Sequence, residues 1–209
     1  MIQVEYWSDY VCPFCYIGSV RLNRAISEFG ADPVEIVMHS FELDPFAPVT
    51  VKQTAAEHFA NKYHLTSEAG RAQVEKISET GRAEGITDMD YANTRSTNTL
   101  DAHRLTKYAL QEEGKDIREL LYHAFFCEHL NIGERSVLLA LADRAGLPAK
   151  RTVGVLDSRE YEAEVRRDER QAKLMDIHTI PHFIVAGKTR IDSSGSVQEL
   201  KAALQSALR

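Results

Sequence analysis

The sequence lacks the long apolar runs, basic clusters and cysteine frameworks that mark several protein classes. It has no run of about 18 apolar residues, the length that a membrane-spanning helix needs, so no membrane partner is expected. Lys and Arg number 25 against 31 Asp and Glu, for a formal net charge of −6. Because nucleic-acid-binding proteins neutralise phosphates with basic patches, this balance disfavours a nucleic-acid partner. Only 3 cysteines in 209 residues cannot build a disulfide scaffold.

The N-terminus also lacks the features of a secretory leader. Its first residues, Met-Ile-Gln-Val-Glu-Tyr-Trp, contain no Lys or Arg and no apolar run followed by a small-residue cleavage site. We therefore expect a cytoplasmic protein. Hydrophobic residues make up 44% of the chain, an ordinary share for a soluble globular protein.

The first 48 residues carry the signals of a strand, a helix and a second strand. Apolar and polar residues alternate over Ile2–Trp7, as they do in a strand. A helical repeat of apolar residues begins at Pro13, and Gly30 is typical of a helix end. Val34–Met38 is rich in β-branched and apolar residues and predicts the second strand.

The long stretch after Pro48 shows helix signals and no convincing strand. In a capping box, a Ser, Thr or Asp side chain stands three residues before a Glu and bonds a free amide at the helix start. Such boxes predict helix starts at Thr54, Asp116 and Asp157. We therefore expect a helical insertion.

The last residues return to strand and helix signals. His182–Ala186 and Thr189–Asp192 are strand patterns on either side of a Gly-Lys turn, and a capping box at Ser196 predicts a final helix. The predicted class is α/β, with the order β-α-β, helical insertion, β-β-α.

Two of the cysteines form the motif Cys12-Pro13-Phe14-Cys15, between the first predicted strand and the helix. The free amides and dipole of a helix N-terminus stabilise a thiolate, so Cys12 is placed to attack a disulfide. Pro13 suits the first turn because its missing N–H needs no partner there. Cys15 lies one turn further along and is placed to resolve the mixed disulfide. The motif predicts thiol–disulfide exchange.

A zinc site is the alternative interpretation of the motif. Zinc sites built on Cys-x-x-Cys need further ligands, and the sequence has no second Cys-x-x-Cys, although His178 or His182 could approach in space. We predict no metal.

A proline also stands at the mouth of a predicted strand, where Ile180-Pro181 precedes His182. Proline cannot donate to a sheet, so it belongs at a strand start or edge. A cis bond at Pro181 would expose the preceding backbone for pairing with an extended peptide. On its own, a proline before a strand commonly does no more than mark the start of the strand. The presence of the dithiol makes Pro181 a candidate substrate contact.

Four segments together resemble the DsbA-like thioredoxin-fold oxidoreductases. The resemblance is to the FrnE-like branch, which is grouped with 2-hydroxychromene-2-carboxylate isomerases and kappa-class glutathione transferases. The segments are Asp9-Tyr10-Val11-Cys12-Pro13-Phe14-Cys15-Tyr16-Ile17-Gly18, Phe41-Glu42-Leu43-Asp44-Pro45, Asn98-Thr99-Leu100-Asp101-Ala102-His103-Arg104-Leu105, and Ile180-Pro181 before a strand with Gly187-Lys188.

The resemblance implies a discontinuous thioredoxin domain, residues 1–48 and 178–209, interrupted by a helical insertion domain, residues 49–177. It implies that Pro181 is a cis-proline facing the dithiol, with Ile180 beside the sulfur atoms. Pro13, Phe14, Ile180 and Pro181 are accordingly the expected substrate-binding residues, and Cys12 and Cys15 the catalytic ones.

We therefore predict a thiol–disulfide oxidoreductase that reduces, forms or isomerises disulfides. The isomerases and kappa transferases typically carry serine at the position of Cys12, which favours this interpretation. No metal or organic cofactor is expected, and glutathione is a candidate co-substrate. The expected partners are a disulfide-containing protein or a small-molecule thiol, and a homodimer is compatible with the sequence. The alternatives are a glutathione-dependent isomerase or transferase acting on a small aromatic substrate, and a zinc-binding module without catalysis.

Some further polar residues have simpler interpretations. Cys127 stands four residues after His123 on one predicted helix face, but a small buried hydrophobe explains it better than a thiol–imidazole pair. For His103 and Asn98 a helix-surface or capping role is at least as good as a functional one. Asp9 would oppose a thiolate if its carboxylate faced the sulfur of Cys12.

Overall fold

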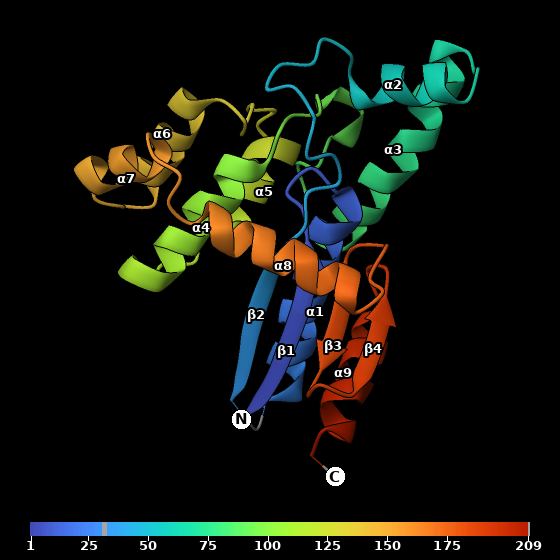
Figure 1. Cartoon of the computed structure of the whole chain (residues 1–209). Coiled ribbons are helices and arrows are strands. Elements are labelled where there is room, and N and C mark those ends of the chain that lie inside the picture. The colour runs from blue at the N-terminus through green and yellow to red at the C-terminus, as the bar shows by residue number, and fades with distance from the viewer. Residues whose placement is uncertain (31–32, 209) are drawn as a thin grey trace.

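The computed structural model describes residues 1–30 and 33–208. Its sheet has four strands: β1 (Ile2–Ser8), β2 (Val34–Ser40), β3 (His182–Val185) and β4 (Thr189–Asp192). Their order is β2-β1-β3-β4 (Figure 1). β1 is parallel to β2 and antiparallel to β3, and β4 is antiparallel to β3. With its inserted helices, this mixed sheet confirms the predicted thioredoxin fold.

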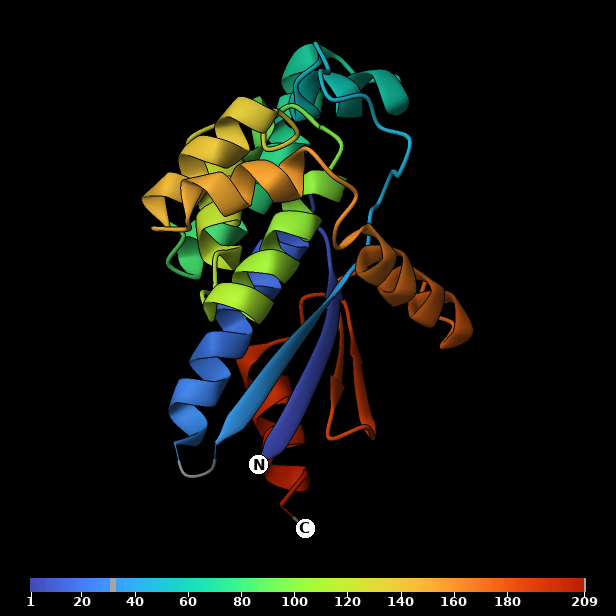
Figure 2. The same cartoon turned by 60° about the vertical axis from the view of Figure 1, so that its left-hand side comes forward.

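Helices cover both faces of the sheet. α1 (Pro13–Phe29) and α9 (Val197–Ser206) lie on one side, and α8 (Glu162–Leu174) lies on the other (Figure 2). Neighbouring residues of β1 point to opposite faces, as the pleat requires. Tyr6 packs into the core with α1 and α9, whereas Trp7 packs beneath α8. β1 is therefore buried on both faces and holds its C-terminal end, where the dithiol begins, in a fixed position.

The remaining helices lie between β2 and β3 in the sequence and gather beyond one end of the sheet (Figure 1). They are α2 (Ala55–Lys62), α3 (Ser67–Ala83), the short 3₁₀ helix η1 (Tyr91–Asn93), α4 (Leu100–Glu113), α5 (Arg118–Phe126), α6 (Arg135–Arg144) and α7 (Ala149–Leu156). The described residues contain no strand in this stretch, as the sequence predicts. The domain boundaries at residues 48 and 178 stay a prediction.

Two of the predicted capping boxes are confirmed. Thr54 and Ser196 each accept a bond from the backbone of a Glu three residues later, and that Glu bonds back to the cap residue. The prediction of a capping box at Asp116 is wrong. α5 begins at Arg118, and the Asp116 carboxylate instead accepts bonds from the Arg118 backbone and guanidinium.

The box at Asp157 is also wrong, because a distant side chain determines where these helices end and begin. Asp157 ends α7, and α8 begins only at Glu162, after Tyr161 in a left-handed conformation with φ of 64°. The Arg104 guanidinium, from α4, bonds the carbonyl oxygens of Val155, Ser158 and Glu160. These bonds hold the segment as a loop.

A buried polar cluster fastens α8 to the sheet. The Asp168 carboxylate lies 3.2 Å from Nδ1 of His39, accepts a 2.8 Å bond from the Ser40 backbone, and pairs with Lys107. Trp7 donates its indole N–H to the Asp168 carbonyl at 3.2 Å and stacks on His39 with ring centroids 4.3 Å apart. One acidic side chain thus joins β2, α4 and α8.

Replacing Asp168 with asparagine is expected to destabilise the protein by about 2 kcal/mol at neutral pH, because Lys107 and His39 lose a charged partner. Burial raises the pKa of Asp168, but bonds from His39 and Lys107 outweigh it and hold the pKa below its ordinary 3.8. This carboxylate therefore contributes its stability above pH 3.8 and loses it as the pH falls through the lowered value. Urea unfolding of both proteins across this range should show the difference shrinking in acid. A difference that stays constant would contradict the assignment.

Candidate active site

The dithiol lies where β1 ends and α1 begins. Cys12 is the N-cap residue of α1 and Pro13 its first residue. The Cys12 amide donates to the carbonyl of Asp9 at 3.2 Å, while the Cys12 carbonyl accepts from the amides of Cys15 and Tyr16 at 3.1 and 3.3 Å. Both thiols are free, with Cys12 5% exposed and Cys15 fully buried. This geometry places Cys12 at the positive end of the helix dipole, as the motif predicts.

The Ile180–Pro181 segment lies against the dithiol. The Ile180–Pro181 peptide bond is cis, and the Cys12 thiol donates to the Ile180 carbonyl at 3.8 Å. Phe14 is 43% exposed beside Cys12, and Ile180 is half-buried, whereas Pro13 and Pro181 are buried. The structure therefore brings the predicted site residues together around one sulfur. Their contact with a substrate stays a prediction.

Gly18 permits this close approach of α1 to the proline loop. A Cβ atom at Gly18 would lie 3.0 Å from Cγ of Pro181 and 3.1 Å from the Phe183 ring. We expect Gly18→Val to push Pro181 away from Cys12, to destabilise the protein by about 1 to 3 kcal/mol and to slow reaction of the Cys12 thiol. Thermal unfolding and the rate of thiol alkylation measure both effects. Gly154→Val is the matched control, since the nearest atom to its Cβ position, on the Arg151 side chain, lies 4.0 Å away. Equal effects of the two variants on alkylation would refute the steric explanation.

Cys15 lies in the first turn of α1, where its thiol is shielded from solvent. Burial raises the pKa of the Cys15 thiol well above its ordinary value, and the neighbouring Cys12 raises it further. Hydrogen bonds from the Ser8 hydroxyl and the Asp9 backbone act in the opposite direction. The two thiols thus differ in environment, as an attacking and a resolving sulfur should.

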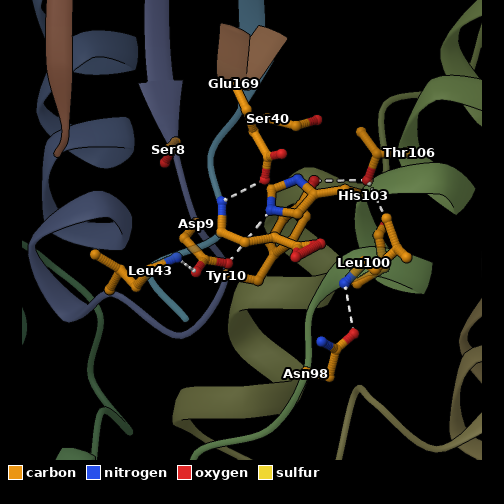
Figure 3. Close-up of polar contacts among 12 residues, drawn as sticks. Ser8, Asp9, Tyr10, Ser40, Leu43, Asn98, Leu100, His103, Thr106 and Glu169 are labelled. Carbon is orange, nitrogen blue, oxygen red and sulfur yellow. Dashed lines mark hydrogen bonds and ion pairs between the residues drawn. The ribbon is translucent and has the colours of Figure 1, made fainter. Parts of the chain in front are cut away.

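The Asp9 carboxylate bonds groups other than the Cys12 sulfur, as Figure 3 shows. One oxygen accepts a 2.8 Å bond from the Leu43 backbone, and the other lies 3.3 Å from Nε2 of His103. Asp9 and His103 are each 1% exposed. The interpretation of His103 as a surface or capping residue is therefore wrong, whereas Asn98 does accept the Leu100 amide next to the start of α4.

A second buried carboxylate, Glu42, lies near this pair. Its Oε2 is 3.3 Å from Arg166, and its Oε1 has no hydrogen-bond partner among the described residues. Burial raises the pKa of Glu42, while Arg166 and His103 act against that rise. The loop after β2 thus packs against the dithiol loop through buried polar groups.

A pocket of about 540 Å³ opens next to the dithiol. Val11 and Tyr91 line it, and burial raises the pKa of Tyr91 to about 12, with Cys12 close enough to contribute. The wall mixes apolar, polar and charged side chains: Asp9, Val11, Leu43, Asp44, Ala47, Pro48, Val51, Gln53, Thr54, Ala55, His58, Lys62, Tyr91, Thr94, Ser96, Thr97 and Phe125. Val11 is the chain neighbour of Cys12, but neither cysteine of the dithiol and none of the four expected substrate-binding residues is part of this wall.

Residues 1–30 and 33–208 contain no group of three or more His, Cys, Asp or Glu arranged to hold a metal ion. His178 and His182 instead contact Asp176 and Asp192, at 2.8 and 2.6 Å. None of the helices in these ranges combines the length and the apolar composition that a membrane span requires.

Cys127 lies apart from the dithiol, at the end of α5. Its predicted neighbour His123 faces Glu128 at 3.1 Å. Cys127 is half-buried against the core, and burial raises the pKa of its thiol to about 11. This environment fits the simpler interpretation of Cys127 as a small hydrophobe.

The sequence patterns did not single out two buried hydroxyl groups that bond each other, those of Ser8 and Tyr122. The Ser8 and Tyr122 oxygens lie 2.5 Å apart, and both residues are fully buried. Ser8 ends β1, four residues before Cys12, so its position beside the motif was a usable signal. Tyr122 lies on α5 and carries no comparable signal.

Comparison with known proteins gives one family and several similar folds. The sequence profile described as the DSBA-like thioredoxin domain matches residues 3–205. A probable DsbA oxidoreductase from Streptomyces coelicolor is 30% identical, with a TM-score of 0.92 over 100% of this chain and 90% of that one.

Two further solved structures share the fold at lower identity. The cytosolic disulfide reductase DsbM from Pseudomonas aeruginosa is 18% identical, with a TM-score of 0.63 over 99% of this chain and 98% of that one, and it has also been solved with GSH. A 2-hydroxychromene-2-carboxylate isomerase is 12% identical, with a TM-score of 0.72 over 99% of this chain and 96% of that one.

Proposed function

Because the chain belongs to the DSBA-like thioredoxin domain family, we propose that it is a thiol–disulfide oxidoreductase that works through Cys12 and Cys15. The observation that carries the proposal is the placement of Cys12 at the start of α1, with its sulfur 3.8 Å from the Ile180 carbonyl. A thiolate there is stabilised by the helix N-terminus. The adjacent carbonyl belongs to backbone that can align an extended substrate.

The proposed reaction moves two electrons between sulfur atoms. The Cys12 thiolate attacks one sulfur of a substrate disulfide, whose other sulfur leaves as a thiolate. Cys15, having lost its proton, then attacks the Cys12 sulfur, so that the Cys12–Cys15 bond forms and the second substrate sulfur leaves. The two protons of the dithiol end on the two substrate sulfurs. Substrate oxidation is the same sequence in reverse. No metal or organic cofactor is needed, because the sulfur atoms carry the electrons.

The proposed substrates are disulfide-containing proteins or small-molecule thiols and disulfides, with glutathione as a co-substrate. The fold shared with a disulfide reductase that has been solved with GSH supports this choice. The pocket lined by Val11, the chain neighbour of Cys12, offers polar and apolar groups to such a substrate. We place the protein in the cytoplasm, whose glutathione pool is reducing, so net reduction or isomerisation is the proposed direction.

Titration of the dithiol against glutathione buffers tests the proposal. Alkylation followed by mass spectrometry should show a reversible two-electron transition between the dithiol and a Cys12–Cys15 disulfide. A potential far above that of the glutathione pool would overturn the proposed direction. If the pair never forms a disulfide, the oxidoreductase proposal fails.

The variant Cys15→Ser distinguishes the proposed disulfide exchange from the main competing function. A disulfide exchanger loses turnover when Cys15 is replaced by serine. This chain shares its fold with a 2-hydroxychromene-2-carboxylate isomerase. A glutathione-dependent isomerase that activated glutathione at Cys12 alone would keep its activity in Cys15→Ser.

A further inference from the structure

The Asp9 side chain joins three separate parts of the chain at one buried point. Its Oδ2 accepts a 2.8 Å bond from the Leu43 amide, in the loop after β2, and its Oδ1 lies 3.3 Å from Nε2 of His103, on α4 (Figure 3). Its backbone carbonyl accepts the Cys12 amide at 3.2 Å. Because Asp9 and His103 are both buried, bulk water does not replace these bonds. The dithiol loop, the loop after β2 and α4 therefore hold one another in place.

His103 gives this point a fixed support. Its helix, α4, is held by the bonds of the Arg104 guanidinium and by a 2.6 Å bond between the Thr106 and Tyr10 hydroxyls. The His103 ring also packs against the Tyr10 ring, with centroids 4.9 Å apart. His103 is therefore an anchor that fixes the position of the Asp9 carboxylate.

The segment that Asp9 holds has no regular secondary structure of its own. Residues 41–54 lie within the described part of the chain and form neither helix nor strand. Two successive amides near the start of this segment donate to carboxylates, that of Glu42 to Glu169 at 3.4 Å and that of Leu43 to Asp9 at 2.8 Å. Since the bond to Glu169 is long, the bond to Asp9 is the stronger restraint on the path of the segment.

The same segment forms part of the wall of a pocket. This pocket, of about 540 Å³, is lined by residues of the segment, by Asp9 and by Val11, the chain neighbour of Cys12. Its volume is typical of pockets that hold small organic ligands. A disulfide with peptide-sized substituents can fill such a pocket, whereas a disulfide with short substituents makes few contacts there. The position of the wall should therefore matter to the first kind of substrate and not to the second.

We propose that Asp9 and His103 hold residues 41–48 as a wall of this pocket, and that this wall selects disulfides with peptide-sized substituents for attack by Cys12. The inference rests on the proposed exchange function and names a substrate class for it. Asp9 and His103 are positioning residues. The recorded partner of the Cys12 thiol is the Ile180 carbonyl, and both oxygens of the Asp9 carboxylate have other partners.

Two disulfides of different size measure this selection: oxidised glutathione, and bis(2-hydroxyethyl) disulfide, whose substituents are short. The reduced protein is mixed with each, and the loss of thiols is followed by alkylation and mass spectrometry. Asp9→Ala removes both side-chain bonds. We expect it to lower the second-order rate constant for oxidised glutathione about tenfold, the loss expected for hydrogen bonds to a charged group, and to change that for the small disulfide less than about twofold. His103→Ala should act in the same direction but more weakly, because the Leu43 bond remains.

Two asparagine variants are the matched controls. Asp9→Asn keeps an oxygen for the Leu43 amide and gains an N–H group that can face Nε2 of His103, so it should retain most of the preference for oxidised glutathione. Asp168→Asn weakens a buried cluster that does not line the pocket. It should leave the ratio of the two rate constants unchanged, although it destabilises the protein.

Equal slowing with both disulfides in Asp9→Ala would overturn the inference, because it would indicate a general effect on the Cys12 thiol or on the fold. A loss in Asp9→Asn as large as that in Asp9→Ala would also overturn it, since charge and not position would then be responsible. If Asp9→Ala does not fold, an unchanged ratio in His103→Ala is sufficient to overturn it. Failure of the proposed function is distinct, because the wild-type protein would then form no Cys12–Cys15 disulfide with either reagent.

Discussion

Replacing Cys12 with serine is expected to lower the rate of disulfide exchange by about a thousandfold or more, because a serine hydroxyl is not ionised at neutral pH and cannot form the mixed disulfide. Cys12 lies at the start of α1 with its sulfur against the Ile180 carbonyl, and the buried Cys15 cannot replace it as the attacking thiol. Cys15→Ser should behave differently. Its reaction should stop at the mixed disulfide, which mass spectrometry detects as a mass added at Cys12.

The third cysteine provides the control for these variants. Cys127→Ser removes a half-buried thiol at the end of α5 and should leave the exchange rate unchanged. Reduction of a model disulfide, followed continuously, measures all three variants. Substantial exchange by Cys12→Ser, or trapping of substrate at Cys127, would contradict the assignment of the attacking thiol.

Replacing Arg104 with alanine is expected to destabilise the protein by about 3 to 5 kcal/mol. Its guanidinium, 4% exposed, bonds the carbonyls of Val155, Ser158 and Glu160 and the Asp101 carboxylate. The variant would remove the Arg104 donor from the Ser158 and Glu160 carbonyls, whereas the Val155 carbonyl keeps the Ser158 amide and hydroxyl as donors. Because four bonds of a charged donor are lost together, the loss exceeds that of one surface ion pair.

Urea unfolding of Arg104→Ala and Arg159→Ala measures this difference. Arg159 pairs with Glu162 at 2.7 Å, but its side chain is 86% exposed, so its removal should leave the unfolding midpoint nearly unchanged. Similar midpoints for the two variants would show that the Arg104 bonds contribute no more than a surface pair.

The sequence was sufficient to predict the parts of the fold that depend on local patterns. Alternation over Ile2–Trp7 predicted β1, and a proline start with a glycine end predicted α1 within one residue of its observed bounds. The family predicted from four motifs is confirmed by the profile match over residues 3–205. These features depend on neighbours in the chain, which a single sequence displays directly.

The contacts that support the dithiol could not be predicted in the same way. His103 and Asp9 are 94 residues apart in the sequence, and Tyr122 and Ser8 are 114 apart. No periodicity links such pairs, because tertiary packing alone brings them together. The failed capping box at Asp157 has the same cause, since the side chain that holds this loop comes from Arg104, on another helix.

The buried pairs described above cross the boundary that the sequence places between sheet and insertion. Ser8, Asp9 and His39 belong to the sheet or its loops, and each contacts a side chain of the helical stretch. Excising the insertion would expose these polar groups or leave them without partners. The helical stretch therefore completes the buried interior at this end of the sheet. We expect the two parts of the chain to melt as one cooperative unit.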